Sequence, residues 1–289
     1  MKIAILGTEN SHAYAFAKQI KENPDFADVE LVGVYGYDDA ANQKLLSEGL
    51  ASYAAKTPDE FLGKVDGVMI TARHGKHHYE YGMPYIKAGV PLFIDKPFAF
   101  TSAQAAEMIA EAKKSGCLMC GGSSLRYLDE LLPVRRYAAK ALADGKFMGG
   151  HVTAPVQMVN DYGNFFFYAE HLIDIMTEVF GYDIKSVSAD CPDVTKNNMS
   201  VVFHYDGFDV TGRYMDGYFY SAVAYSKDGL KEAFADNYYY CYTKELQSFT
   251  DMVKTGKMHY SYEELAFPVK LIETIKEAYE SGRKVEFSI

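Results

Sequence analysis

Short apolar runs alternate with segments of helical spacing over residues 1–121. Each apolar run is predicted as a buried strand, and each segment after it as a helix with one apolar face. The predicted strands lie at 2–6, 29–35, 67–72, 91–95 and 118–121, and the predicted helices at 12–21, 40–47, 78–87 and 101–114. Thr57-Pro-Asp-Glu60 adds a further helix start. This order predicts a parallel, doubly wound α/β sheet with right-handed crossovers.

The pattern changes after Gly121. A helix at 129–142 precedes longer segments of alternating apolar and polar residues, at 150–158, 184–190, 199–205, 207–215 and 218–226. Alternation joined by short turns predicts a mixed or antiparallel sheet. Helices at about 243–254 and 263–281 close the chain. We therefore predict an α/β domain at 1–121 and an α+β domain at 122–289, and the terminal helix could pack back on the first domain.

Composition and charge narrow the class of partner. With 48% apolar and 24% charged residues, the 289-residue chain resembles ordinary soluble globular proteins. A formal net charge of -10 without any run of Lys or Arg argues against nucleic acid or an anionic membrane as a partner. No apolar run approaches the roughly 20 residues that span a bilayer, and the apolar start is too short for a signal peptide. We expect a cytoplasmic protein.

The cysteines and histidines have spacings that could suggest metal or redox chemistry. Cys117-Leu-Met-Cys120 has the spacing of a redox or zinc motif, but it lies in a strand-like segment without a second Cys or His pair. His74 and His78 are four residues apart, and only Glu80 accompanies the local histidines as an acidic ligand. We expect free, structural cysteines and no metal site.

Two predicted strands end in residues that suggest a binding site. The strand at 91–95 stops at Asp95-Lys96-Pro97, because proline cannot donate to a continuing sheet. Such carboxyl ends hold the ligands of open α/β sheets, although a charged pair there is also an ordinary solvated edge. The first strand ends at Gly7, and the following helix, capped by Asn10 or Ser11, would present free backbone N–H groups to an anion.

Several segments together resemble the Gfo/Idh/MocA oxidoreductases, which pair a Rossmann domain with a mixed-sheet domain. The segments are the opening strand to Gly7, 65–77, 89–98, 122–127, His171-Leu-Ile-Asp174 and Ala278-Tyr-Glu-Ser-Gly282. The resemblance implies a Rossmann-like dinucleotide-binding domain at 1–121 and a substrate-binding and oligomerisation domain at 122–289. It also implies an NAD(P)-dependent oxidoreductase that interconverts a secondary alcohol and a ketone on a sugar, cyclitol or related polyol.

The family's Glu-Lys-Pro signature stands here as Asp95-Lys96-Pro97. The resemblance implies that Lys96 lies between the nicotinamide and the reacting hydroxyl, and that His171 from the second domain accepts the proton. Such a reaction needs a base for the hydroxyl proton and a cation near the developing oxygen charge. Imidazole, with an ordinary pKa near 6.5, suits the first role. Asp95 is interpreted as a support for Lys96.

The resemblance extends to further binding positions. The cofactor-binding residues would be Gly7, Thr8, Asn10, Ser11, Gly36, Tyr37, Thr71, Arg73, His77, Asp95 and Lys96, and the substrate-binding residues Arg126, Tyr168 and His171. For Arg126, a structural ion pair is an equal alternative.

The sequence also departs from the family pattern. Of the Gly-x-Gly-x-x-Gly fingerprint only Gly7 remains, with Glu9 and His12 in place of the other glycines. Because a carboxylate there adds bulk and like charge near a pyrophosphate, the alternative function is a noncatalytic or cofactor-impaired relative that binds a sugar-like ligand or a partner protein. Phe167 replaces a common Asp, in an aromatic stretch that suits stacking on a sugar or cyclitol ring.

The residues give weaker indications of the choice between NAD and NADP and of the oligomeric state. Gly36-Tyr37 stands where an acid often binds the adenosine ribose, and Asp38 and Asp39 could substitute for that acid. The absence of an arginine that would bind a 2′-phosphate slightly favours NAD over NADP. The second domain's strands carry Tyr214, Tyr218, Tyr220 and Tyr225. An aromatic, half-polar sheet face predicts a homodimer or homotetramer through this sheet, and the alternative is a face covered by the chain's own helices.

Overall fold

The computed structural model describes residues 1–288, which divide into two compact units. The first unit joins Met1–Gly122 with Tyr239–Ala266, and the second joins Ser123–Tyr238 with the chain from Phe267 onward.

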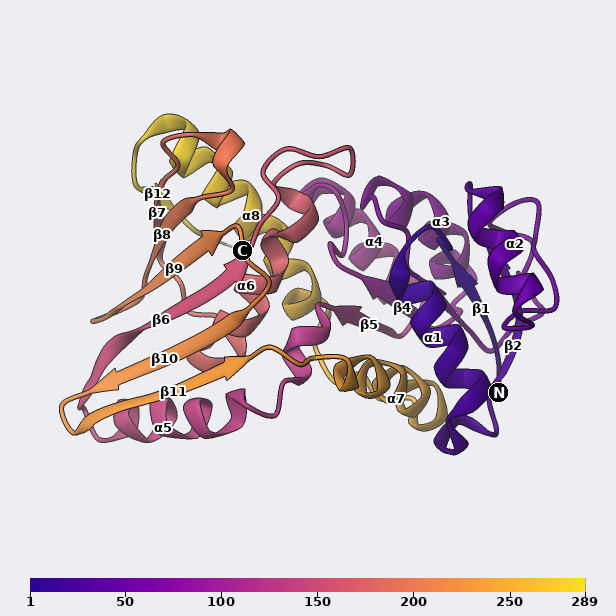
Figure 1. Cartoon of the computed structure of the whole chain (residues 1–289), viewed down its shortest axis with the longest axis horizontal. Coiled ribbons are helices and arrows are strands. Elements are labelled where there is room, and N and C mark those ends of the chain that lie inside the picture. The colour runs from indigo at the N-terminus through magenta and orange to yellow at the C-terminus, as the bar shows by residue number, and fades with distance from the viewer. Residues whose placement is uncertain (289) are drawn as a thin grey trace. The chain divides into compact units, whose positions relative to one another are not determined.

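The first unit contains a five-stranded parallel sheet in the order β2-β1-β3-β4-β5 (Figure 1). Its strands are β1 (Lys2–Leu6), β2 (Glu30–Tyr35), β3 (Gly67–Ile70), β4 (Leu92–Asp95) and β5 (Met119–Gly122). Its helices are α1 (Ser11–Glu22), the short η1 (Pro24–Phe26), α2 (Asp39–Ser47), α3 (Lys76–Lys87), α4 (Ser102–Ser115) and α7 (Tyr240–Thr255). Every residue of β3, β4 and β5 is buried, which explains their continuous apolar runs. The predicted doubly wound sheet is confirmed.

Helix α7 belongs to the first unit, whereas the sequence predicted a first domain that is continuous over 1–121. Leu246, Phe249 and Met252 lie on one face of α7 and join the core formed by α1 and the sheet. Phe249 contacts Phe93 of β4, with ring centroids 6.4 Å apart. Covering this face of the sheet is the physical reason that a distant segment belongs to the first unit.

The helix predicted to start at Thr57 does not form. Residues 57–64 make a series of turns instead. The Glu60 carboxylate accepts the backbone N–H of Lys56 at 2.9 Å and also bonds the Tyr53 hydroxyl. These local bonds satisfy polar groups without a helix.

The second unit contains a seven-stranded mixed sheet in the order β11-β10-β6-β9-β8-β7-β12. Its strands are β6 (Phe147–Pro155), β7 (Ser186–Asp190), β8 (Met199–His204), β9 (Asp209–Met215), β10 (Tyr220–Ser226), β11 (Gly229–Ala235) and β12 (Val285–Glu286). The remaining elements are η2 (Ser124–Tyr127), α5 (Leu131–Ala143), α6 (Phe166–Phe180), η3 (Val194–Lys196) and α8 (Tyr262–Ser281), which begins in the first unit. Among the described strands of this sheet, only β6 and β9 pair in parallel. Strand β11 was not predicted because its residues are mostly exposed and include charged side chains.

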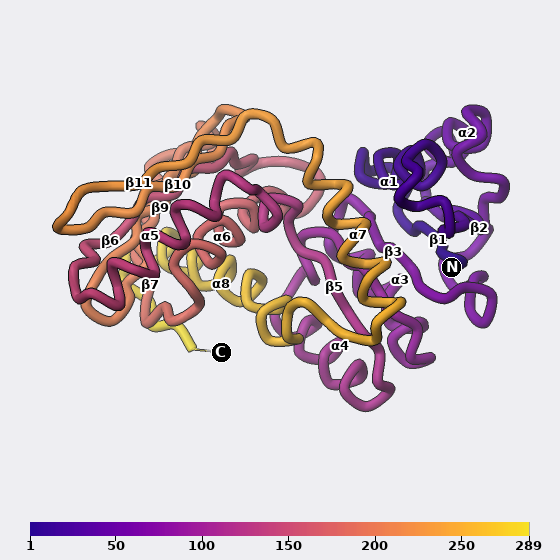
Figure 2. Tube along the Cα trace, turned by 90° about the horizontal axis from the view of Figure 1, so that it is seen from below, coloured from indigo at the N-terminus to yellow at the C-terminus, as the bar shows by residue number. Residues whose placement is uncertain are grey.

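The sequence suggested that the tyrosines of this region share one face of the sheet, but in the structure they do not. Helices α5 and α6 cover one side of the sheet (Figure 2). Tyr214 and Tyr220 are 0% and 3% exposed, and the Tyr214 hydroxyl donates to the Ala169 carbonyl of α6 at 2.7 Å. Tyr218 and Tyr225 are 59% and 39% exposed. Strand alternation therefore places Tyr214 and Tyr220 in the core.

Candidate active site

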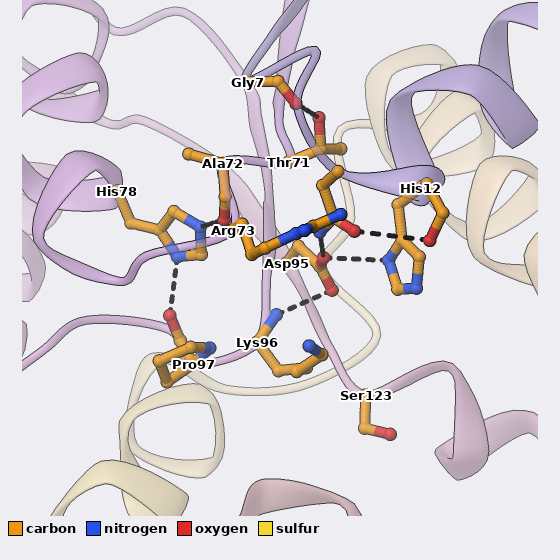
Figure 3. Close-up of polar contacts among 12 residues, drawn as sticks. Gly7, His12, Thr71, Ala72, Arg73, His78, Asp95, Lys96, Pro97 and Ser123 are labelled. Atoms are coloured by element: carbon orange, nitrogen blue, oxygen red, sulfur yellow. Dashed lines mark hydrogen bonds and ion pairs between the residues drawn. The ribbon is translucent and has the colours of Figure 1, made fainter. Parts of the chain in front are cut away.

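Asp95 is the centre of the polar cluster at the carboxyl end of β4 (Figure 3). Its side chain is fully buried. Oδ2 accepts the Asn10 amide at 3.0 Å and lies 2.8 Å from Nδ1 of His12, and Oδ1 accepts the backbone N–H of Lys96 at 2.8 Å. The start of α1 is thereby tied to the end of β4.

The cluster keeps Asp95 ionised. Burial alone would raise the pKa of Asp95, but the charge and hydrogen bond of His12, followed by the charges of Lys96 and His78, lower this pKa from 3.8 to about 2. The lowered pKa gives this buried carboxylate a negative charge next to Lys96 in the chain.

His12 has a role that the sequence did not suggest. In the Gly-x-Gly-x-x-Gly fingerprint this position is a glycine, which lets the helix pack closely on the strand. In the structure it is 6% exposed, pairs with Asp95 and packs on Tyr242 of α7 with ring centroids 4.8 Å apart. The pairing with Asp95 explains how an imidazole is accommodated at this position.

Lys96 follows Asp95 directly and is 4% exposed. The Lys96–Pro97 peptide bond is cis, which the sequence did not predict. Lys96 and Asp95, both predicted site residues, are consecutive in the chain and therefore lie together at the end of the strand.

His78 is the buried histidine of the 74–78 segment, whereas His77, the predicted cofactor residue, is partly exposed. His78 is 0% exposed, with its two ring nitrogens 2.7 Å from the Ala72 carbonyl oxygen and 2.6 Å from the Pro97 carbonyl oxygen. It connects the loops that follow β3 and β4 (Figure 3). Burial lowers the pKa of His78. The helical spacing of His78, Tyr81 and Tyr85 could have identified it as inward-facing.

The end of β1 is packed closely against the end of β3. Gly7 has φ +103°, and a Cβ there would lie 2.1 Å from the Ala72 nitrogen. The Thr71 hydroxyl donates to the Gly7 carbonyl at 3.0 Å, and Glu9 accepts the backbone N–H of Arg73 at 3.0 Å. Thr71 and Glu9 therefore brace these two loops, and cofactor contact by Thr71 and Arg73 stays a prediction.

The start of α1 fits the anionic part of a dinucleotide. Asn10 occupies the N-cap position, but its side chain donates to Asp95 and does not cap the helix, contrary to expectation. The first turn has no acidic residue. Uncapped N–H groups at a helix N-terminus suit a pyrophosphate, because the helix dipole favours negative charge there. Ser11, the first helical residue, lies at this end.

A buried network braces the end of β2, where a Rossmann fold receives the adenosine ribose. The Thr8 hydroxyl donates to Asn42 at 2.7 Å, and the Asn42 amide donates to the Gly36 carbonyl at 2.8 Å. A Cβ at Gly36 would lie 2.0 Å from the Thr8 hydroxyl oxygen. Asn42 was missed because it lies mid-helix. Asp38 caps α2 by accepting the N–H of Ala40 at 2.9 Å.

Tyr37 and His77, both predicted cofactor residues, are neighbours. Their ring centroids are 5.4 Å apart, and His77 stacks on Tyr81 at 5.2 Å. Tyr37 is 54% exposed. An exposed aromatic ring beside the end of β2 offers a flat surface to a planar base.

In the second unit, His171 lies in α6 and is 6% exposed. Its Nδ1 is 2.6 Å from the Ser123 hydroxyl oxygen. The Ser123 N–H donates to Asp174 at 2.8 Å, and Asp174 pairs with Arg126 at 2.7 Å, with both charged side chains fully buried. This supports the structural alternative for Arg126, and its contact with substrate stays a prediction.

Aromatic rings surround His171 within the same unit. Tyr168 and Tyr220 lie edge-on to it, with ring centroids at 5.0 Å and 6.0 Å. Phe167 is 9% exposed and packs between Tyr162 at 5.2 Å and Tyr168 at 5.0 Å. Phe167 thus belongs to an aromatic row that leads to His171.

The thiols are free, as predicted. Burial raises the pKa of Cys117 to about 12 and raises that of Cys120 well above its usual value. Among residues 1–288, no group of three or more His, Cys, Asp or Glu side chains could hold a metal ion. No helix in that range is long and apolar enough to cross a membrane.

Known proteins resemble this chain in sequence and in fold. Residues 1–122 match the GFO_IDH_MocA model, described as an oxidoreductase family with an NAD-binding Rossmann fold. An uncharacterized oxidoreductase of Escherichia coli K12, YhhX, is 29% identical over 150 residues, which cover 45% of this chain and 41% of that protein.

Solved structures share the fold along the whole chain. A putative myo-inositol dehydrogenase from Sinorhizobium meliloti 1021 superposes with a TM-score of 0.84 at 18% identity, covering 100% of both chains. A scyllo-inositol dehydrogenase from Lactobacillus casei, solved with NAD(H) and scyllo-inositol, gives 0.81 at 15% identity, covering 99% of this chain and 98% of the other. Residues 1–122 therefore match the Gfo/Idh/MocA oxidoreductase model with its NAD-binding Rossmann fold, and the solved structures share the fold of the whole chain.

Proposed function

We propose that this protein is an NAD-dependent dehydrogenase that interconverts a secondary alcohol and a ketone on a cyclitol, sugar or related polyol. The observation that carries the proposal is Lys96, buried at the carboxyl end of β4 beside an ionised Asp95, in an NAD-binding Rossmann fold. A fixed cation at this edge suits a reaction in which negative charge develops on oxygen.

The cofactor site would be formed by the carboxyl edge of the first sheet. The uncapped start of α1, from Ser11, would hold the pyrophosphate, and the braced end of β2 at Gly36 and Tyr37 would receive the adenosine. The acidic residues Asp38 and Asp39 disfavour a 2′-phosphate at that end. Bound NAD supplies the hydride acceptor for such a reaction.

The chain's own residues would handle the proton and the charge. Lys96 would stabilise negative charge on the reacting oxygen, and Asp95 would keep Lys96 in a fixed electrostatic environment. His171 would accept the hydroxyl proton, since an imidazole is basic enough for this near neutral pH. These roles follow the family resemblance and the positions of both residues in buried, polar surroundings.

The substrate class is supported by aromatic surroundings and by the named neighbours. Tyr168 and Tyr220 flank His171. Aromatic rings suit the C–H faces of a sugar or cyclitol ring, which are apolar and flat. One neighbour in fold binds scyllo-inositol, and another is named as a putative myo-inositol dehydrogenase. We therefore propose a cyclic polyol as the substrate.

We also propose that the protein works as a homodimer or homotetramer in the cytoplasm, with the second sheet as the interface. The sheet face opposite α5 and α6 carries Tyr225, Leu230 and Phe234, which are 39%, 56% and 58% exposed. Exposed apolar residues gathered on one sheet face are typical of subunit contacts.

Calorimetric titration with NAD and NADP, followed by turnover on a panel of inositols and sugars, tests the function. We expect NAD to bind more tightly than NADP, and at least one cyclic polyol to reduce NAD. No binding of either cofactor at millimolar concentration would contradict the proposal and favour the noncatalytic alternative, for which the carboxylate of Glu9 near the start of α1 is the supporting observation.

A further inference from the structure

The hydroxyl of Ser123 lies within hydrogen-bond distance of the His171 ring. Its oxygen lies 2.6 Å from Nδ1 of His171 and also accepts the backbone N–H of Leu125 at 3.2 Å. Ser123 is fully buried. No sequence pattern singled out Ser123, because its partner is 48 residues away on another element.

Asp174 holds the backbone of Ser123 in place. Its backbone N–H donates to Asp174, and Asp174 pairs with the guanidinium of Arg126. Asp174 and His171 are three residues apart on α6, so they lie on the same side of that helix. The buried ion pair thus fixes the turn that carries Ser123 against the helix that carries His171.

Two arrangements of hydrogens are compatible with this contact. In the first, Nδ1 carries the ring hydrogen and donates to Ser123, which leaves the lone pair on Nε2. In the second, the serine hydroxyl donates to Nδ1, which gives the hydroxyl hydrogen a partner but places the ring hydrogen on Nε2. The hydrogen bond made by one imidazole nitrogen decides which nitrogen is free to accept a proton.

We propose that Ser123 is a positioning residue that holds neutral His171 in the tautomer with hydrogen on Nδ1, so that Nε2 is the proton acceptor. This inference rests on the proposed function, which needs a lone pair on Nε2. A serine oxygen has two lone pairs and can accept both the Leu125 N–H and Nδ1–H. The same Nδ1–H bond persists when Nε2 gains a proton, so the ring need not turn during the reaction.

Nitrogen NMR of the full-length protein labelled with ¹⁵N-histidine reads the tautomer without any substrate. His171→Gln identifies the signal among the eight histidines. We expect Nδ1 of His171 to be the protonated nitrogen. Ser123→Ala should shift the signals towards the Nε2–H form, whereas Ser124→Ala, the same change at the buried neighbour in η2, should leave them in place.

Kinetics give the second readout once a turned-over polyol is known. Ser123→Ala should lower kcat roughly 10- to 100-fold, by analogy with the loss of an outer partner of a metal-bound histidine, with little change in the Kd of NAD. Ser123→Thr, which keeps the hydroxyl, should restore the tautomer and part of the rate. Thermal unfolding of each variant separates this effect from lost stability.

The outcomes separate this inference from the proposed function. An Nε2–H tautomer in the unmodified protein, or a tautomer unaffected by Ser123→Ala, would overturn the role of Ser123 even if the protein oxidises polyols. An Nδ1–H tautomer that depends on Ser123 would support the positioning role even if no polyol is turned over, in which case only the proposed reaction fails.

Discussion

At the scale of single residues, Asp95 shows how context changes the interpretation of a side chain. It is one methylene shorter than the glutamate of the family signature and was interpreted as a support for Lys96. In the structure the buried Asp95 carboxylate contacts Asn10, His12 and the backbone N–H of Lys96, and its role as a support for Lys96 stays a prediction. The sequence placed Asp95 at a strand end but gave no indication of these partners from α1.

The lowered pKa of Asp95 predicts an acid-dependent loss of stability. Because its pKa falls from 3.8 to about 2 on folding, ionised Asp95 stabilises the fold fully above about pH 4, and this contribution is lost as the pH falls through about 2. The shift corresponds to about 2 kcal/mol. Asp95→Asn should therefore lose more free energy of unfolding, relative to the unmodified protein, at about pH 5 than at about pH 2.

Urea unfolding at a series of pH values measures this difference. Asp144→Asn serves as the control, because Asp144 pairs with Lys140 in solvent and its removal should change little at any pH. A constant difference between the Asp95→Asn variant and the unmodified protein across this pH range would show that Asp95 is not held ionised by its neighbours.

Lys96 and His171 are predicted to act as a unit in the proposed reaction. Lys96→Met should lower kcat/KM by roughly 10³-fold and His171→Gln by a similar factor, because each removes a charge or proton partner of the transition state. The double variant should lose much less than the product of the two factors, as expected for groups that serve one step. Steady-state rates on the active polyol measure both effects.

Lys114→Met, at an exposed lysine of α4, is the matched control and should leave the rate unchanged. Multiplicative losses in the double variant would indicate that the two residues act in separate steps. Unchanged rates in the Lys96→Met variant would remove the lysine from the chemistry altogether.

At the scale of elements, the turn from β1 into α1 combines a close approach with a binding surface. Gly7 brings β1 against the loop after β3, and Asn10 leaves the helix start uncapped by turning towards Asp95. The sequence predicted the strand, the turn and the helix correctly. Its expectation that Asn10 or Ser11 caps the helix was wrong for Asn10, because a cap needs Oδ1 to face the helix N–H groups, whereas the fold turns Nδ2 towards Asp95.

Gly7→Ala should destabilise the first unit by roughly 3 kcal/mol or more, since the new Cβ would meet the Ala72 backbone at a positive φ. Gly63→Ala is the matched control: its φ is +73° but nothing lies within 4 Å of the new Cβ, so the cost should be about 1 kcal/mol. Chemical unfolding of both variants gives the comparison. Equal costs would show that crowding at Gly7 is relieved by small backbone shifts.

At the scale of the whole molecule, the predicted assembly follows from the second sheet. Light scattering should give a mass of two or four chains of 32.3 kDa. Phe234→Asp, on the sheet face away from the helices, should shift the protein towards the monomer, because a charge would be buried at the contact. Val194→Asp, at the exposed η3, should leave the mass unchanged. A monomeric unmodified protein would contradict the proposal.

The sequence by itself determined the alternation of strands and helices around the first sheet, its parallel pairing and the positions of the strand-end residues Asp95 and Lys96. These follow from the period of apolar positions and from residues adjacent in the chain, which local chemistry specifies. Arg126 shows the limit, since the same arginine suits an ion pair or a substrate until its partner is seen.

Only the tertiary structure decided the pairings across the chain. It brought His12 to Asp95, Ser123 to His171 and Arg126 to Asp174, placed α7 in the first unit, and turned Tyr214 into the core while Tyr225 stayed exposed. The physical reason is that such contacts depend on the direction in which each side chain leaves a packed element. The periodic spacing of apolar residues shows which face of a helix or strand is buried, but it does not show which residue of another element contacts that face.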